Sequence, residues 1–222
     1  MTELNFVNNL RFLSVLAVVF LHCSAQIFIS ANKGGFDWWV SNIFDSSVRW
    51  SVPVFVMLSG ALLLSKNHND LKDFYTKRMN KILIPILFWT VFYLLWTVIK
   101  GAVNNDSVTI ILLLKKLLLG KPYYHMWYLF MLIPLYAITP FIRRLLVNIS
   151  DKALMLLLVF AFLLSMLNTV ESYIFQPSKV FFNWFLLYIP YFVLGYVLVT
   201  SKTYKSNKIL SLVLISSIIC TI

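Results

Sequence analysis

Two residues that could perform chemistry share the first apolar run of the chain. Arg11 opens this run, and His22 follows eleven residues later. Ionisable side chains within membrane-length apolar sequence are costly, by about 2.5 to 3.5 kcal/mol for arginine, so each is a candidate functional residue. Eleven residues of helix return to nearly the same face, about 16 Å further along the axis. A base deep in the membrane and an anion-binding group on the same face suit the transfer of an acyl group.

Both residues also have ordinary interpretations. His22 can be a neutral histidine that is hydrogen-bonded inside a helix bundle. Arg11 can extend its side chain from the edge of the membrane to water and lipid headgroups. Their position on one helix face favours the functional interpretation of both residues together.

The composition indicates what carries these residues. Hydrophobic residues make up 60% of the chain and charged residues 12%, and the mean hydropathy is +0.83. This excludes a soluble domain and is typical of a polytopic membrane protein. We expect an all-α transmembrane bundle with about six complete spans, at residues 10–31, 44–65, 82–100, 123–142, 153–172 and 180–200.

The last apolar run begins at Ile209 and stops with the chain at Ile222. Fourteen residues of helix cover about 21 Å of a hydrocarbon core that is about 30 Å thick. We therefore expect a truncated seventh span, in a single membrane domain over residues 1–222 that lacks its C-terminal part.

The net charge of +11 is distributed unevenly among the expected loops. The even-numbered loops carry eleven positive residues and the odd-numbered loops six. The positive-inside rule then places the even-numbered loops and the N-terminus in the cytoplasm. Because this charge sets the topology, we expect the lipid bilayer as a partner and no nucleic acid. The chain has no metal-ligand spacing, no phosphate-binding glycine loop and no paired carboxylates within a span, so no metal site is expected.

The second expected span contains polar and helix-breaking residues. Asp45 and Arg49 are four residues apart and can pair on one helix face. Pro53 breaks the span. The span closes on Ser59 and Gly60, small residues that allow helices to approach closely.

A basic cluster precedes the expected start of the third span at Ile82. Lys77, Arg78 and Lys81 form this cluster. Free backbone N–H groups and the helix dipole favour phosphate at a helix N-terminus, so the cluster is a candidate phosphate site. Alternatively, the cluster only sets the membrane topology, and this explains its positive charge equally well.

The fourth span is preceded by a short apolar segment and an aromatic cluster. Residues 108–119 are too short to cross the membrane, and they predict an interfacial or re-entrant helix that ends at Gly120. His125 and Trp127 follow within an aromatic run, which we expect at the outer boundary of the span. Such a cluster can bind a substrate or simply anchor the helix at the interface.

Five segments together resemble the integral-membrane acyltransferase family 3, which includes bacterial O-acetyltransferases of cell-surface polysaccharides. Arg11 and His22 have the spacing of the family's first-helix signature. This signature is specific in combination with the segment that begins at His125. At Lys81 the family commonly has arginine, and lysine keeps the charge but loses the bidentate phosphate geometry. The other four segments are VPVFVMLSGALLL (52–64), YTKRMNKILIP (75–85), HMWYL (125–129) with Tyr136, Thr139 and Pro140, and YIPYFVLGY (188–196).

The resemblance implies a membrane O-acyltransferase of the bacterial plasma membrane. It would move an acyl group, above all acetyl, from acyl-CoA to a hydroxyl of a cell-surface polysaccharide or a lipid-linked glycan precursor. His22 and Arg11 would be catalytic, with His22 as the general base or as a nucleophile that forms an acyl-histidine. Acetyl-CoA would be a co-substrate, with no tightly bound cofactor. The implied substrate-binding residues are Arg78, Lys81, His125, Trp127 and Ser59.

Two other functions stay open at this point. The chain also resembles the membrane halves of vancomycin-resistance serine racemases, which implies transport or substrate supply instead of catalysis. Alternatively, the protein is an inactive truncated remnant of an acyltransferase.

Overall fold

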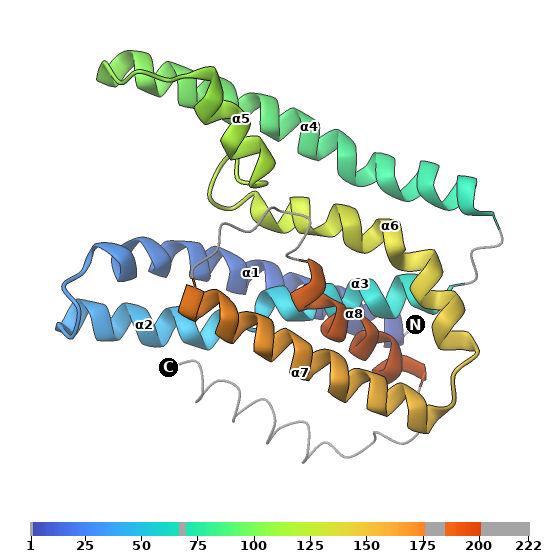
Figure 1. Ribbon diagram of the computed structural model, residues 1–222. Helices are drawn as coiled ribbons and strands as arrows, with labels where there is room; N and C mark the ends of the chain where they lie inside the picture. The colour runs from blue at the N-terminus through green and yellow to red at the C-terminus, as the bar shows by residue number, and fades with distance from the viewer. Residues whose placement is uncertain (1, 67–69, 176–184, 201–222) are drawn as a thin grey trace. The chain divides into compact units, whose positions relative to one another are not determined.

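The computed structural model describes residues 2–66, 70–175 and 185–200, and the regular secondary structure in this part of the chain is helical (Figure 1). This confirms the expected all-α class. The expected seventh span lies outside the described residues, and the single-domain assignment stays a prediction. The helices are α1 (Thr2–Ser30), α2 (Phe36–Val48), α3 (Ser51–Leu64), α4 (Leu71–Asn104), α5 (Ile110–Leu118), α6 (Trp127–Val147), α7 (Asp151–Phe175) and α8 (Phe185–Thr200).

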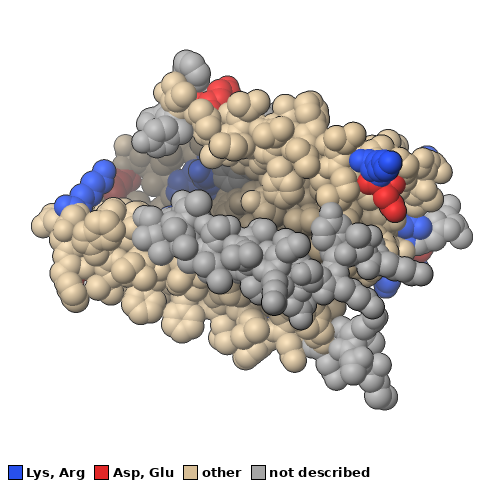
Figure 2. Space-filling model, turned by 90° about the horizontal axis from the view of Figure 1, so that it is seen from below, with Lys and Arg blue, Asp and Glu red and all other residues tan. Residues whose placement is uncertain are grey.

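Five described stretches are long and apolar enough to cross a membrane, and α8 is a shorter apolar helix. Large apolar side chains cover the outside of these helices, and Phe12, Phe88 and Phe160 are each more than 60% exposed. One face of the molecule carries mostly uncharged side chains (Figure 2). Apolar surface of this extent is a liability in water and is expected against lipid. The five stretches are Phe6–Ser30, Phe36–Leu64, Leu71–Asn104, Trp127–Val147 and Asp151–Glu171.

Contacts divide the chain into two units. Within the described residues, the first unit comprises α1, α2, α3 and the part of α8 from Tyr191 onward. The second unit comprises α4 to α7 and the start of α8 as far as Pro190. Each unit is described by itself below.

In the first unit, α1 and α2 form an antiparallel hairpin (Figure 1). A short loop with Gly34 at φ +83° joins them, and the rings of Phe28 and Trp38 lie 5.5 Å apart beside it. The buried residues of α1 are small, namely Ser14, Ala17 and Ser24. Small residues let helix backbones approach closely in a membrane.

The second expected span consists of two helices, α2 and α3, which follow one another nearly in line (Figure 1). They separate at Arg49 and Trp50, four and three residues before Pro53. Proline has no N–H to donate to the carbonyl of residue 49, and Val54 N resumes the helical bonding to Trp50 O at 3.1 Å. The predicted break is therefore confirmed, one turn before the proline.

Helices α3 and α8 cross with their backbones in contact. A Cβ added at Gly60 would lie 1.8 Å from the carbonyl oxygen of Phe192, and one added at Gly195 would lie 1.9 Å from that of Met57. No side chain fits at either position. Two of the five family-like segments, 52–64 and 188–196, therefore meet at one crossing.

In the second unit, α4 and α6 pack antiparallel to each other. The Tyr75 hydroxyl near the start of α4 donates to Ala137 O, midway along α6, at 2.7 Å. Further along α4, a buried apolar cluster joins the two helices through Ile86, Met126 and Phe130. Helix α7 is tied to the start of α8, because Ser165 Oγ donates to Leu187 O at 3.1 Å.

The short helix expected at 108–119 is confirmed as α5. Thr109 caps it by accepting a hydrogen bond from Leu112 N, and Gly120 ends it at φ +63°. None of its residues is buried. Its Lys116 Nζ donates to Thr97 Oγ1 of α4 at 3.2 Å, which anchors the helix to the second unit.

Candidate active site

Arg11 and His22 lie on one unbroken helix of the first unit. Helix α1 runs from Thr2 to Ser30, so the helical spacing predicted for the two residues is realised. Arg11 is exposed and His22 is half-buried. The arrangement presents a potential base about 16 Å along the helix from a fixed positive charge.

Helix α2 adds an ion pair between a buried acid and a half-exposed arginine to this unit. Asp45 is 3% exposed and accepts a hydrogen bond from Arg49 Nε at 2.7 Å. The sequence predicts this pairing, and it assigns the pair no chemistry. Charged residues within an expected span are candidate functional residues, and this signal was present in the sequence.

Ser59, also in the first unit, lies far from His22. It precedes Gly60 at the crossing of α3 and α8. Phe44 and Phe20 line one groove, so they mark the same level of the α1–α2 hairpin. Ser59 is fifteen residues beyond Phe44, or about 20 Å along the nearly collinear α2 and α3. The structure therefore does not bring Ser59 to the histidine.

Arg78 and Lys81 lie in the second unit, on the cytoplasmic side in the predicted topology. The predicted helix start at Ile82 is wrong, because α4 begins at Leu71 and Asp70 caps it by accepting a hydrogen bond from Lys72 N at 2.8 Å. The helix continues through the basic cluster, where the N–H groups are used within the helix. Any phosphate there would be bound by side chains alone, without the helix dipole.

The neighbouring Lys77 is paired with Asp73 at 2.8 Å, between exposed side chains. Such an exposed pair contributes little to stability. Arg78 and Lys81 are three residues apart and therefore project from neighbouring positions on the helix surface. Arg78 is half-buried and Lys81 is exposed.

His125 is enclosed by tyrosines in the second unit. Its ring centroid lies 5.1 Å from that of Tyr93, 5.2 Å from Tyr123 and 5.0 Å from Tyr124. Tyr93 and Tyr123 stack on each other at 4.5 Å. The sequence marks the loop tyrosines as an aromatic cluster, whereas only the fold adds Tyr93 from α4.

The contact with Tyr93 places His125 beside the apolar stretch of α4, at the start of its own span. The apolar stretch of α4 lies between Lys81 and Lys100, and Tyr93 is seven residues, or about 10 Å, before Lys100. The loop is held at this level because Met126 is buried in the apolar cluster with Ile86. His125 therefore lies two residues before the membrane-length stretch that begins at Trp127, in contact with an aromatic side chain of α4.

Trp127 begins α6 beside this cluster. Its ring lies 5.9 Å from that of Tyr188 at the start of α8. The second unit thus has two separate groups of predicted residues. One is Arg78 with Lys81, and the other is His125 with Trp127, about 18 Å further along α4 at the level of Tyr93.

Lys116 was not predicted as a site residue. It is half-buried, and its ammonium reaches a hydroxyl one helical turn above Tyr93. It forms no ion pair with any described residue. In the sequence, Lys116 is one of two lysines in a short apolar segment. Lysines are common in interfacial segments, so nothing in the sequence marked this one as a site residue.

Comparison with known proteins identifies the family of the chain. A search of curated proteins and a search of solved structures found no match. The family model of the acyltransferase domain known as acyltransferase family 3 matches residues 4–222, nearly the whole chain. With its apolar helices and its Arg11–His22 face, the chain belongs to this family of membrane acyltransferases.

Proposed function

We propose that this protein is an O-acetyltransferase of the bacterial plasma membrane. It moves acetyl from acetyl-CoA to a hydroxyl of a cell-surface polysaccharide or a lipid-linked glycan precursor. The observation that carries the proposal is the presence of Arg11 and His22 on one continuous membrane helix, in a chain that belongs to an acyltransferase family.

His22 is the general base of the proposed reaction. A histidine acts as a base in its neutral form, in which one ring nitrogen can accept a proton. The imidazole takes the proton from the acceptor hydroxyl while the hydroxyl oxygen attacks the thioester carbonyl. Direct attack by the imidazole, which forms an acyl-histidine, is the other route open to this side chain.

The positive residues serve the donor, and the aromatic residues serve the acceptor. Arg11, Arg78 and Lys81 bind the phosphates of CoA through charge-assisted hydrogen bonds. His125 and Trp127 shape the acceptor site, because an aromatic surface suits the apolar face of a sugar ring. Ser59 is assigned to substrate binding by the family resemblance alone.

The test is transfer of radiolabelled acetyl from acetyl-CoA into glycan by membranes that contain the chain. We expect His22→Ala to lower the transfer rate by about 10² to 10⁴, the usual contribution of a general base. Membrane insertion should be unchanged, because the substitution removes an ionisable group from an apolar helix.

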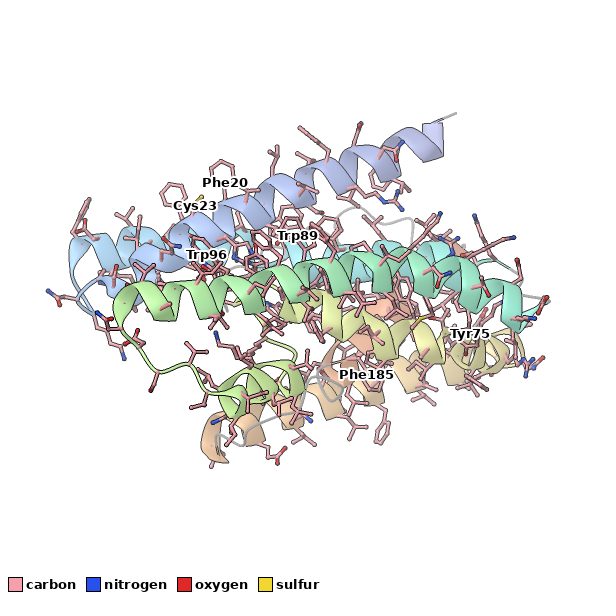
Figure 3. All side chains as sticks on the ribbon, turned by 90° about the horizontal axis from the view of Figure 1, so that it is seen from above. Phe20, Cys23, Tyr75, Trp89, Trp96 and Phe185 are labelled. Carbon is pink, nitrogen blue, oxygen red and sulfur yellow. The ribbon has the colours of Figure 1, made fainter. Side chains whose placement is uncertain are left out.

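Cys23→Ala is the matched control, since Cys23 is the next residue of α1 and lines the groove toward α2 with Phe20 (Figure 3). It should transfer acetyl at the wild-type rate. Normal transfer by inserted His22→Ala protein would rule out the histidine as the base. Amino-acid uptake by vesicles without any acetyl transfer would favour the transport alternative.

A further inference from the structure

The Asp45–Arg49 pair has a guanidinium with unused donors. Both Nε and Nη2 of Arg49 lie within bonding distance of Asp45 Oδ2. Arginine has five N–H donors, and Arg49 has no other side-chain partner among the described residues. Asp45 is buried, whereas the Arg49 side chain is 50% exposed. The carboxylate therefore holds one edge of the guanidinium, and the other edge can receive hydrogen-bond acceptors.

The pair lies close to the level of His22 along the α1–α2 hairpin. One groove of this hairpin runs from Ile27 and Asp37 near the loop to Phe20 and Phe44 at its other end. With the Phe28–Trp38 ring contact beside the loop, this places Phe20 near the level of Phe44. His22 is two residues from Phe20, or about 3 Å along the axis, and Asp45 directly follows Phe44. The Asp45 carboxylate and the imidazole are therefore within about one helical turn in depth.

The pair and the histidine also lie on the side of the hairpin away from this groove. His22 is rotated about 160° around α1 from Phe20, and Arg49 about 140° around α2 from Phe44. None of His22, Asp45 and Arg49 lines the groove. The break between α2 and α3 ends the helix at Arg49, so the cation stands at a helix end in mid-span.

We propose that Arg49 is a further catalytic residue, which stabilises the oxyanion of the acyl-transfer step. This inference rests on the function proposed above. As the acceptor oxygen bonds to the thioester carbon, the electron pair of the C=O bond moves to the carbonyl oxygen. The free N–H groups of Arg49 donate to that oxygen while His22 holds the proton of the acceptor hydroxyl. Collapse restores C=O and breaks the C–S bond, and the proton passes from His22 to the leaving thiolate.

The competing explanation is that the pair only stabilises the fold. A buried ion pair is weak evidence for stability, because a matched neutral replacement is often equally stable. Removing one partner alone is destabilising, since it leaves a buried charge without compensation. The two roles are therefore separated by replacing both residues together.

The experiment measures kcat and KM for acetyl-CoA in the same transfer assay, with the Tm of the detergent-solubilised protein. The variants are Arg49→Met, Arg49→Lys and the double variant Asp45→Leu with Arg49→Met, because methionine has no N–H group to donate. Loss of an oxyanion donor lowers kcat by about 10² to 10³. We expect this loss in the double variant, with a Tm near that of the wild type and little change in KM. Arg144→Gln, on the exposed last turn of α6, is the control and should match the wild type.

A double variant that recovers wild-type kcat would overturn the catalytic role of Arg49 and leave the proposed function intact. Wild-type membranes without any transfer would overturn the proposed function, and this inference with it. Arg49→Lys keeps a cation with N–H donors next to Asp45 and should retain part of the wild-type kcat. If the double variant fails to fold, Arg49→Met decides, because it removes every N–H donor of the side chain. A folded Arg49→Met protein with wild-type kcat would then contradict the proposal.

Discussion

At the scale of single residues, the chemistry of this protein depends on ionisable groups placed in apolar helices. Arg11 and His22 are related by the helix period alone, so their common face was predictable from the sequence. The Asp45–Arg49 contact was predictable for the same reason, because residues four apart are neighbours on a helix. The depth of that pair relative to His22 depends on how α2 packs on α1, and no local pattern predicts it.

Arg11 is expected to act mainly in donor binding. Arg11→Ala should raise the KM for acetyl-CoA by about 10- to 100-fold, because a hydrogen bond to a charged group contributes about 1.5 to 3 kcal/mol. The kcat at saturating donor should change little. Steady-state transfer at varied acetyl-CoA checks this, with Lys152→Ala as an exposed basic control. A fall in kcat at constant KM would instead place Arg11 in the chemical step.

At the scale of helices, the family-like segments are explained by packing as much as by chemistry. Gly60 and Gly195 belong to two segments that are far apart in the sequence, and each contacts the backbone of the other helix. Tyr75, in a third segment, ties α4 to α6 through its hydroxyl. The resemblance in these segments is therefore evidence for the fold, whereas Arg11 and His22 are the evidence for the proposed reaction.

Alanine at either crossing glycine should destabilise the protein. A methyl group at Gly60 or Gly195 would overlap a carbonyl oxygen, so α3 and α8 must move apart. Overpacking of this kind costs about 1 to 3 kcal/mol, so each variant should show a lower Tm in detergent. Gly35→Ala is the control, because its added methyl group would meet a single atom, Asn32 O, at 3.1 Å. If all three variants keep the wild-type Tm, the close crossing does not limit stability.

At the scale of the whole molecule, the number and type of elements follow from composition. The apolar runs predicted six spans, and the described residues contain five membrane-length stretches and the shorter α8. The predicted span boundaries differ most from the observed helix ends where a helix extends beyond the apolar run. Helix α4 begins eleven residues before the predicted span, because Asp70 provides a cap and the basic cluster is compatible with a helix.

The orientation of the chain is also a prediction at this scale. The distribution of Lys and Arg places the loop at Lys33 outside and the loop at Lys152 in the cytoplasm. In a background with Cys23 and Cys220 replaced by serine, Lys33→Cys should react with a membrane-impermeant maleimide in intact cells. Lys152→Cys should react only after the membrane is permeabilised. The reverse pattern would show an N-terminus outside.

By itself, the sequence determined the membrane class, the approximate spans and the face shared by Arg11 and His22. These depend on local properties, namely the apolar content of a run and the helix period. The tertiary structure decided that α3 crosses α8 at Gly60 and Gly195, and that His125 packs on Tyr93. It also decided that Asp45, which holds the Arg49 guanidinium, lies near the level of His22. In a membrane, faces toward lipid and faces toward protein are both apolar, so the sequence pattern does not reveal which helices are neighbours.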